Sequence, residues 1–316
     1  SDGRPVVIMN PASGAREIGV LELELFRPRG SAVFTQITRS SLRMSTEEVP
    51  PAASVQTLLA PYRQRTDAYL GRVIGSSDSE LTTRDAFFFD APLMELIHRS
   101  MRFATNAHVS FASPPAPDVT LEPGELSIGD VFSLLPYESF VVSLRLTGAE
   151  IARYLEYSYS QWYTRMRGPY DHLVNFEGAD LTGMPERWHQ FDTAGGLRYT
   201  YDAARPSGER IRISGFTNGR PFRRDETYIA AITSYRASGG GGHLLEGVGL
   251  SREDIAQRIV SSSTRDVKHQ VITWLERERI FTPRDEASWY VVPEAWGAAG
   301  YLNDYPRLFG DIPQLQ

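Results

Sequence analysis

Cysteine is absent from the 316 residues, which excludes structural disulfides and metal sites built on thiolates. Lysine is almost absent as well, because Lys268 is the only one and the other basic residues are arginine. The sequence also lacks a run of 18 apolar residues and an amino-terminal signal in which basic residues precede apolar ones. The chain as given is therefore not expected to span a membrane.

Positive charge is in short supply, since the net charge is −6 at pH 7 and the isoelectric point is near 5.6. A surface of this sign does not favour the backbone of a nucleic-acid polymer or an anionic membrane. Any nucleotide partner is therefore expected to be a small molecule. The hydrophobic share of 41% and the charged share of 23% are typical of a folded globular protein with an ample core.

Familiar catalytic and metal-binding patterns are missing too. No two of the six histidines stand at the spacing of metal ligands, and the Gly-x-Ser-x-Gly pattern is absent. Asp130 and Glu150 are each explained by a capping box, in which Ser127 and Thr147 are the N-cap residues of two helices. No catalytic centre is therefore predicted within this chain.

What the sequence does contain is a conspicuous glycine run, in Ile232–His243 (ITSYRASGGGGH). Four glycines in a row favour positive φ angles or a close approach of the backbone to another group. They follow the predicted buried strand Thr227–Thr233, and no Gly-Lys-Ser/Thr tripeptide marks a P-loop. Tyr235 and Arg236 at the mouth of the loop suit a planar heterocycle that carries negative charge. The alternative is an ordinary flexible loop.

The amino-terminal segment is predicted to hold strands at Pro5–Met9, Ile18–Phe26 and Ala32–Thr38. Apolar residues at spacings of three and four then predict an amphipathic helix over Ala52–Ile74. Its predicted apolar stripe includes Val55, Leu58, Leu59, Tyr62 and Tyr69.

The rest of the chain alternates between helical and strand patterns. We expect an α+β fold with a mixed, largely antiparallel sheet flanked by helices. Three of the predicted strands are expected to form an antiparallel meander, at Gly196–Asp202, Glu209–Ser214 and Thr227–Thr233. Helices are also predicted over Ser251–Val260 and Thr264–Arg279.

A second aromatic position stands out at Phe191, directly before a Gly-Gly pair and a strand, in Gln190–Asp202 (QFDTAGGLRYTYD). Most phenylalanines are core residues, so burial is the alternative to a role in binding. Several motifs around it resemble the carboxy-terminal domain of the 5'-nucleotidase and 2',3'-cyclic-nucleotide phosphodiesterase family. They are GGLRYTYD at 195–202, PSGER at 206–210, NGRPF at 218–222, DETY at 225–228, the 234–242 loop, LSIGDVFSLLP at 126–136 and LTGAEI at 146–151.

The resemblance implies that the chain holds a base between two aromatic rings, at the positions of Phe191 and Tyr235. Stacking of this kind contributes roughly 1–3 kcal/mol per base. The family's glycine-rich Asn/Arg loop falls on Ser113–Asp118 (SPPAPD), a rigid and locally acidic replacement. Arg236 is expected to supply the charge that this replacement removes. The predicted substrate-binding residues are Phe191, Tyr235, Arg236, Ser113, Asp118, Gly239, Gly240 and Gly241.

The resemblance also implies a domain organisation. Residues 1–48 would be the closing strands of a metallophosphoesterase domain, 49–79 an interdomain helix and linker, and 80–316 the substrate-binding domain. The family's two divalent metal ions bind motifs such as Asp-x-His and Gly-His-x-His, which this sequence lacks. No cofactor is therefore expected in this chain, and the metal ions are expected in an upstream domain of the same protein.

The function implied is substrate recognition for a metal-dependent nucleotide phosphohydrolase, exported to the periplasm or the cell surface. The chain alone is expected to be inactive. Two alternatives stay open, namely a non-catalytic module that binds a nucleotide or nucleoside, and a thiosulfate-ester hydrolase of related architecture.

Overall fold

The structure is a computed structural model that describes residues 10, 17–30, 35–45, 49–177, 183–284 and 287–310, with the backbone alone for 35–45. The chain divides into two compact units, residues 1–66 and 67–316. The predicted strand Pro5–Met9 and the start of the predicted strand Ala32–Thr38 lie outside the described residues.

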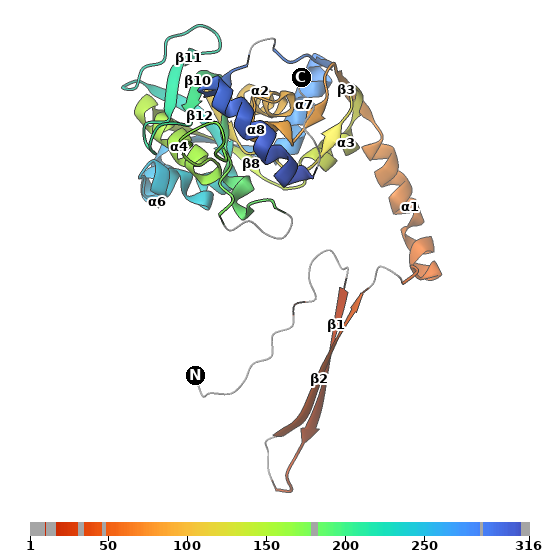
Figure 1. The fold of residues 1–316 in the computed structure, drawn as a ribbon. Helices are drawn as coiled ribbons and strands as arrows, with labels where there is room; N and C mark the ends of the chain where they lie inside the picture. The colour runs from red at the N-terminus through yellow and green to blue at the C-terminus, as the bar shows by residue number, and fades with distance from the viewer. Residues whose placement is uncertain are drawn as a thin grey trace. The chain divides into compact units, whose positions relative to one another are not determined.

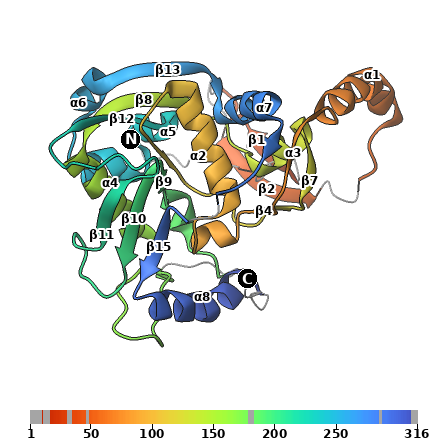
Figure 2. The same ribbon diagram turned by 90° about the horizontal axis from the view of Figure 1, so that it is seen from above.

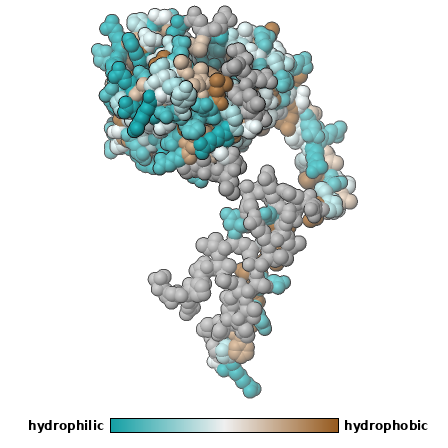
Figure 3. All heavy atoms as spheres, viewed as in Figure 1, coloured by the Kyte–Doolittle hydropathy of each residue, from teal (hydrophilic) through white to brown (hydrophobic). Residues whose placement is uncertain are grey.

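The first unit contains an antiparallel hairpin of β1 (Glu17–Phe26) and β2 (Thr35–Ser45). Helix α1 (Ala53–Leu70) follows it and crosses the boundary between the units. None of the α1 side chains is buried in either unit, although its sequence predicts an apolar stripe. Leu58 and Tyr62 are 69% and 62% exposed, and hydrophobic side chains show among hydrophilic ones along α1 in Figure 3.

The second unit is built on a five-stranded sheet with the order β13-β8-β12-β5-β9. Figure 1 labels two of its strands, β8 and β12. Only the β12–β5 pair is parallel, and the other neighbours are antiparallel. The strands are β5 (Val109–Ala112), β8 (Phe140–Thr147), β9 (Thr193–Gly195), β12 (Thr227–Thr233) and β13 (Ile259–Asp266).

Strand β12 is central because its residues are apolar toward both faces of the sheet. Ala230 and Ile232 belong to one hydrophobic cluster, whereas Ala231 belongs to a second cluster. The first cluster includes residues of α4 (Gly148–Trp162), and the second includes residues of α2 (Pro92–Thr105) and α7 (Val267–Glu278). Helices therefore cover the sheet on both sides, and the predicted α+β class is confirmed.

Smaller sheets surround this core. Figure 2 shows β11 (Ile211–Phe216), β10 (Leu197–Asp202) and β15 (Trp289–Val292) side by side, and α8 (Glu294–Phe309) packs against β15. The other sheets contain β14 (Ile280–Phe281), β3 (Val73–Ser77) and β7 (Gly124–Ser127), and the pair β4 (Leu81–Thr82) and β6 (Thr120–Leu121). The remaining helical segments are η1 (Asp85–Phe87), α3 (Ile128–Leu134), η2 (Glu186–Gln190), α5 (Ser234–Ala237), η3 (Gly240–Gly242), η4 (His243–Gly247) and α6 (Arg252–Arg258).

The topology corrects two predictions. Strand β12 does not continue the β10–β11 pair into a meander, because it lies in the other sheet between β8 and β5. Residues 259–266 (IVSSSTRD), which the prediction gave to the end of one helix, a short link and the start of the next helix, instead form the edge strand β13. Both capping boxes are confirmed: the Ser127 and Thr147 side chains accept hydrogen bonds from the amides of Asp130 and Glu150.

Candidate functional site: an aromatic pocket at one end of the central sheet

Strand directions bring two separate segments together at one end of the five-stranded sheet. Strand β12 runs parallel to β5, and β9 runs antiparallel to β5. The last residues of β12 and the first residues of β9 therefore lie at the same end of the sheet. Tyr235 and Arg236 follow β12, and Asp192 immediately precedes β9. These segments therefore meet at one end of the five-stranded sheet and not of the predicted meander.

A buried ion pair joins the two segments. Arg236 donates hydrogen bonds from Nε and Nη2 to the two carboxylate oxygens of Asp192, at 3.0 and 2.6 Å. The same guanidinium donates to the backbone carbonyls of His189 and Gly240, at 2.8 and 3.4 Å. Both side chains are at most 3% exposed. Arg236 therefore connects the two segments, and the carboxylate of Asp192 neutralises its charge.

Two further groups surround the carboxylate. Tyr154 of α4 donates its hydroxyl hydrogen to Asp192 Oδ2 at 2.6 Å. Burial alone would raise the pKa of Asp192, but the charge of Arg236 and these hydrogen bonds hold that pKa below its ordinary value. His243 is buried nearby, within 2.9 Å of the Gln190 carbonyl oxygen through Nε2. Burial lowers the pKa of His243 to about 4, so its ring is neutral at pH 7.

The glycine run is explained by close contacts on its two sides. A Cβ atom added to Gly240 would lie 2.5 Å from a ring carbon of Tyr235. A Cβ atom on Gly241 would lie 2.2 Å from Nη1 of Arg236, and Gly241 has a φ of +71° that favours glycine. The run therefore packs beneath the aromatic ring and the guanidinium.

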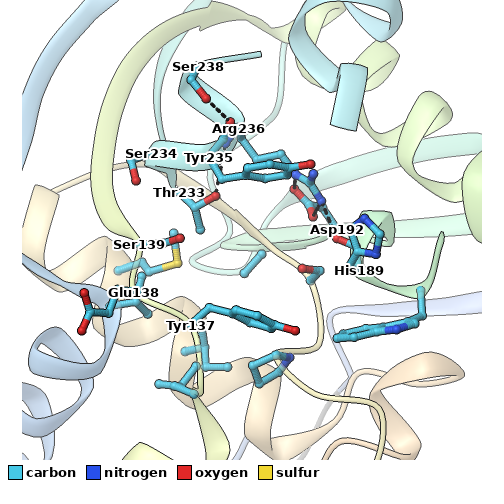
Figure 4. Close-up of a pocket in the computed structure, with 18 residues that line it drawn as sticks. Tyr137, Glu138, Ser139, His189, Asp192, Thr233, Ser234, Tyr235, Arg236 and Ser238 are labelled. Carbon is cyan, nitrogen blue, oxygen red and sulfur yellow. Dashed lines mark hydrogen bonds and ion pairs between the residues drawn. The ribbon is translucent and has the colours of Figure 1, made fainter. Parts of the chain in front are cut away.

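A cavity of about 680 Å³ opens beside these residues (Figure 4), within the size range of small-molecule sites. It is lined by Ile97, Met101, Ala112, Ser113, Pro115, Leu135, Tyr137, Glu138, Ser139, Trp188, His189, Asp192, Thr233, Ser234, Tyr235, Arg236, Ser238 and Val267. Tyr235 is 48% exposed, and the guanidinium of its neighbour Arg236 lies 5.3 Å from the centroid of its ring. The site suits a planar ligand.

Phe191 does not line this cavity, which corrects the predicted arrangement of two facing rings. Its side chain has no exposed surface and packs edge-on against Tyr159, with ring centroids 4.9 Å apart. Trp162, Tyr163 and Trp289 complete its surroundings, at centroid distances of 5.2 to 6.1 Å. The physical reason is that aromatic side chains from the α4 region and β15 pack around the start of β9, so Phe191 is buried among them.

The other predicted residues divide between the cavity and its surroundings. Ser113 lines the cavity, but Asp118 does not, because its carboxylate forms a two-pronged ion pair with Arg84 at 2.6 and 2.7 Å. The backbone of Gly239, Gly240 and Gly241 supports the site from behind and is not among its lining. Arg236 lines the cavity, yet its pairing with Asp192 leaves it no charge to give a substrate.

Sequence reasoning missed Tyr137, Glu138, Trp188 and His189, which also line the cavity. Glu138 is exposed and forms no ion pair with the described residues, and burial and the charge of Arg236 lower the pKa of His189. The charged groups of the lining are thus the neutralised Asp192–Arg236 pair and one free carboxylate. No signal in the sequence marked these four positions, because the turn before β8 and the short segment η2 that carry them have no periodic pattern.

Metal ions find no set of ligands in the part of the chain that the structure covers. Among the described residues, no three histidine, aspartate or glutamate side chains gather closely enough to hold one. These residues therefore do not fit the two divalent ions that the resemblance implies for the family. None of the described helices is both long and apolar enough to cross a lipid bilayer.

Fold and pocket together define an α+β domain with a cavity lined in part by aromatic residues. Residues 73–246, more than half of the chain, match the family described as 5'-nucleotidase, C-terminal domain. The chain therefore belongs to the 5'-nucleotidase C-terminal domain family, which is a family of metal-dependent phosphoesterases.

Curated relatives and a solved structure agree with this family. The chain is 22% identical to the trifunctional nucleotide phosphoesterase protein YfkN of Bacillus subtilis, over 92% of this chain and 21% of that protein. It is 23% identical to a 2',3'-cyclic-nucleotide 2'-phosphodiesterase/3'-nucleotidase of Yersinia enterocolitica, over 76% of this chain and 41% of that protein. A putative 5'-nucleotidase from Staphylococcus aureus has a similar fold, with a TM-score of 0.64, 16% identity, and coverage of 86% of this chain and 50% of that chain.

The chain thus spans less than half the length of these two curated relatives.

Proposed function

We propose that this chain is the nucleoside-binding part of a metal-dependent phosphohydrolase that acts on nucleotides. The observation that carries the proposal is the half-exposed ring of Tyr235, which faces a cavity of about 680 Å³ and is set in place by the buried Asp192–Arg236 pair. Such a ring accepts different bases, since every base has a π-face. The family membership supports a nucleotide as the substrate class.

The charges of the site support different places for the base and the phosphate. Arg236 is the only cationic side chain among the cavity's lining residues, and Asp192 neutralises it. The cavity therefore favours the uncharged end of a nucleotide, and we place the phosphate in an upstream metallophosphoesterase domain. Metal ions bound there would activate water and hold the phosphate oxygens.

The site residues of this chain then have different tasks. Tyr235 stacks on the base, Gly240 leaves room for the ring because it has no Cβ atom, and the Asp192–Arg236 pair holds the loop that carries both. Binding the base in this way orients the ester bond for a reaction that occurs elsewhere. Export to the periplasm or the cell surface remains part of the proposal, on the ground of the family alone.

Calorimetric titration of the 316-residue chain with adenosine, adenosine monophosphate and ribose 5-phosphate tests the proposal. We expect adenosine to bind at least as tightly as its monophosphate, and ribose 5-phosphate not to bind. Tyr235→Ala should weaken adenosine binding by roughly 1–3 kcal/mol, whereas Tyr235→Phe, the matched control, should retain it. Binding of ribose 5-phosphate without any binding of adenosine would contradict the proposal.

A further inference from the structure

A second cavity lies beside helix α4 and shares no lining residue with the cavity next to Tyr235. Its volume is about 300 Å³, at the lower end of the range for small-molecule sites. The lining comes from α4 between residues 152 and 160, from the turn between β10 and β11 at 207–211, from Arg224 before β12, and from η4 at 246–247. We call this hollow the α4 cavity.

Two arginines from separate segments meet at the α4 cavity. The Ala149 amide donates to the carbonyl oxygen of Arg224 at 2.8 Å, which holds the loop before β12 against the first turn of α4. Arg153 follows Ala149 by four residues, so it lies one turn further along the same side of the helix. Both arginines line the cavity. The fold therefore places two guanidinium groups at one hollow.

The carboxylates of the α4 cavity already have partners of their own. Glu156 accepts hydrogen bonds from the amides of Gly208 and Ile211, at 3.0 and 2.6 Å. Glu246 accepts a hydrogen bond from the hydroxyl of Tyr157 at 2.9 Å. These contacts hold both carboxylates toward the β10–β11 turn and toward Tyr157, and neither forms an ion pair with an arginine of the cavity among the described residues.

The two arginines, by contrast, are uncommitted. Arg153 and Arg224 are exposed, and within the described residues neither side chain takes part in a hydrogen bond, ion pair or ring contact. The chain as a whole has a net charge of −6, so it does not attract anions in general. Each guanidinium presents a planar fork of donors that matches a carboxylate in a two-pronged pair. The α4 cavity therefore offers two separate places for a carboxylate.

A ligand with two carboxylates fits this arrangement better than a single phosphate does. Phosphate sites commonly use backbone N–H donors, but the amides of Gly208 and Ile211 are occupied by Glu156. A dicarboxylate can instead pair one end with each guanidinium and needs no backbone donor. Since Glu156 and Glu246 repel an anion, the ligand must lie on the arginine side of the cavity.

We propose that the α4 cavity binds a small aliphatic dicarboxylate, with one carboxylate on Arg153 and the other on Arg224. This inference goes beyond the proposed function and does not depend on it, because the two cavities have no lining residue in common.

Calorimetric titration of the 316-residue chain with malonate, succinate, glutarate and adipate tests the inference, because this series varies the distance between the two carboxylates. Acetate and inorganic phosphate are titrated in parallel. We expect one or two neighbouring lengths of the series to bind at a single site. Acetate pairs with only one arginine, and phosphate lacks backbone donors, so each should bind at least about tenfold more weakly.

Variants then assign the site. Arg153→Ala and Arg224→Ala should each weaken binding of the best dicarboxylate roughly 5- to 30-fold, since each removes one charged pair. Arg153→Lys keeps the charge but loses the fork and should recover part of the affinity. Arg265 is exposed on β13 and outside the lining, so Arg265→Ala is the matched control and should stay within about twofold of wild type. Thermal melts should be unchanged in all four variants.

Three results would overturn the inference. The first is that none of the four dicarboxylates binds the wild-type chain. The second is that Arg153→Ala and Arg224→Ala bind the dicarboxylate as the wild type does, which places its site elsewhere. The third is that phosphate binds as tightly as the best dicarboxylate and weakens equally in both variants. Adenosine affinity should be the same in wild type and Arg153→Ala, and absence of adenosine binding would remove the proposed function while leaving dicarboxylate binding in place.

Discussion

Two aromatic residues lie at the same end of the central sheet but have opposite surroundings. Phe191, before β9, is enclosed by rings from α4 and β15, whereas Tyr235, after β12, is half exposed at a cavity. Their polar neighbours Asp192 and Arg236 are both buried and paired. The comparison teaches that position beside a glycine-bearing segment does not decide whether a ring is exposed at the cavity, because packing from distant elements does.

The largest expected effect separates the two aromatic residues by stability. Phe191→Ala should lower the free energy of unfolding by roughly 3–5 kcal/mol, because it removes a fully buried ring and leaves a cavity. Tyr235→Ala should cost less than about 1 kcal/mol, as expected for a surface position. Urea titrations of both variants measure the difference, and similar losses in the two would abolish the distinction.

Breaking the ion pair that links the two segments should lower the free energy of unfolding by a comparable amount. Asp192→Ala leaves the Arg236 guanidinium buried without its partner, so we expect a loss of roughly 3–5 kcal/mol. The double variant Asp192→Ala/Arg236→Met removes both charges and should recover part of that loss. If the single and double variants unfold at the same denaturant concentration, the pair does not act as a unit.

Acidification should destabilise the glycine loop through His243. Burial lowers the pKa of this histidine to about 4, whereas an exposed histidine titrates near about 6.5. As the pH falls from about 6.5 to 4, the unfolded chain takes up a proton that the folded chain does not. The contribution is therefore complete above about pH 6.5 and declines below it, by up to about 1.4 kcal/mol per pH unit. His243→Gln should flatten this part of the stability profile, and an unchanged slope would contradict the assignment.

The smallest expected change in stability concerns the support of the exposed ring. Gly240→Ala brings a Cβ atom against the movable ring of Tyr235, so the fold should lose less than about 1 kcal/mol. The ring must shift, and adenosine binding should weaken more than the melting temperature suggests. Gly249→Ala is a useful comparison, since Gly249 has positive φ but no neighbouring atom within 4 Å of an added Cβ. Equal adenosine affinity in both variants would show that the Gly240 contact does not position the ring.

Local features of the fold were predictable from the sequence. The capping boxes at Ser127 and Thr147 depend on residues three positions apart, and β12 is marked by its own apolar run. The α+β class follows from such elements. Strand β13 was missed because its serine-rich edge sequence has neither a hydrophobic alternation nor a buried face.

The site was only partly predictable, since long-range packing decides it. Tyr235 could be found from the glycine run that lies beneath it. Tyr137 lies at the cavity because β8 pairs with β12 in this register. Asp118 lies outside it and pairs with Arg84, 34 positions away in the sequence. The burial of Phe191 depends on Trp289, almost a hundred residues further along the chain. The predicted domain limits at 48 and 79 stay predictions.

A crystal structure of the 316-residue chain with adenosine tests the central claim most directly, because it measures where the base lies. The account predicts the base stacked on Tyr235, at a ring-centroid distance of about 4.5–7 Å, with Phe191 still enclosed in the core. A base bound outside the cavity, or one stacked on a Phe191 ring that has turned out of the core, would contradict it.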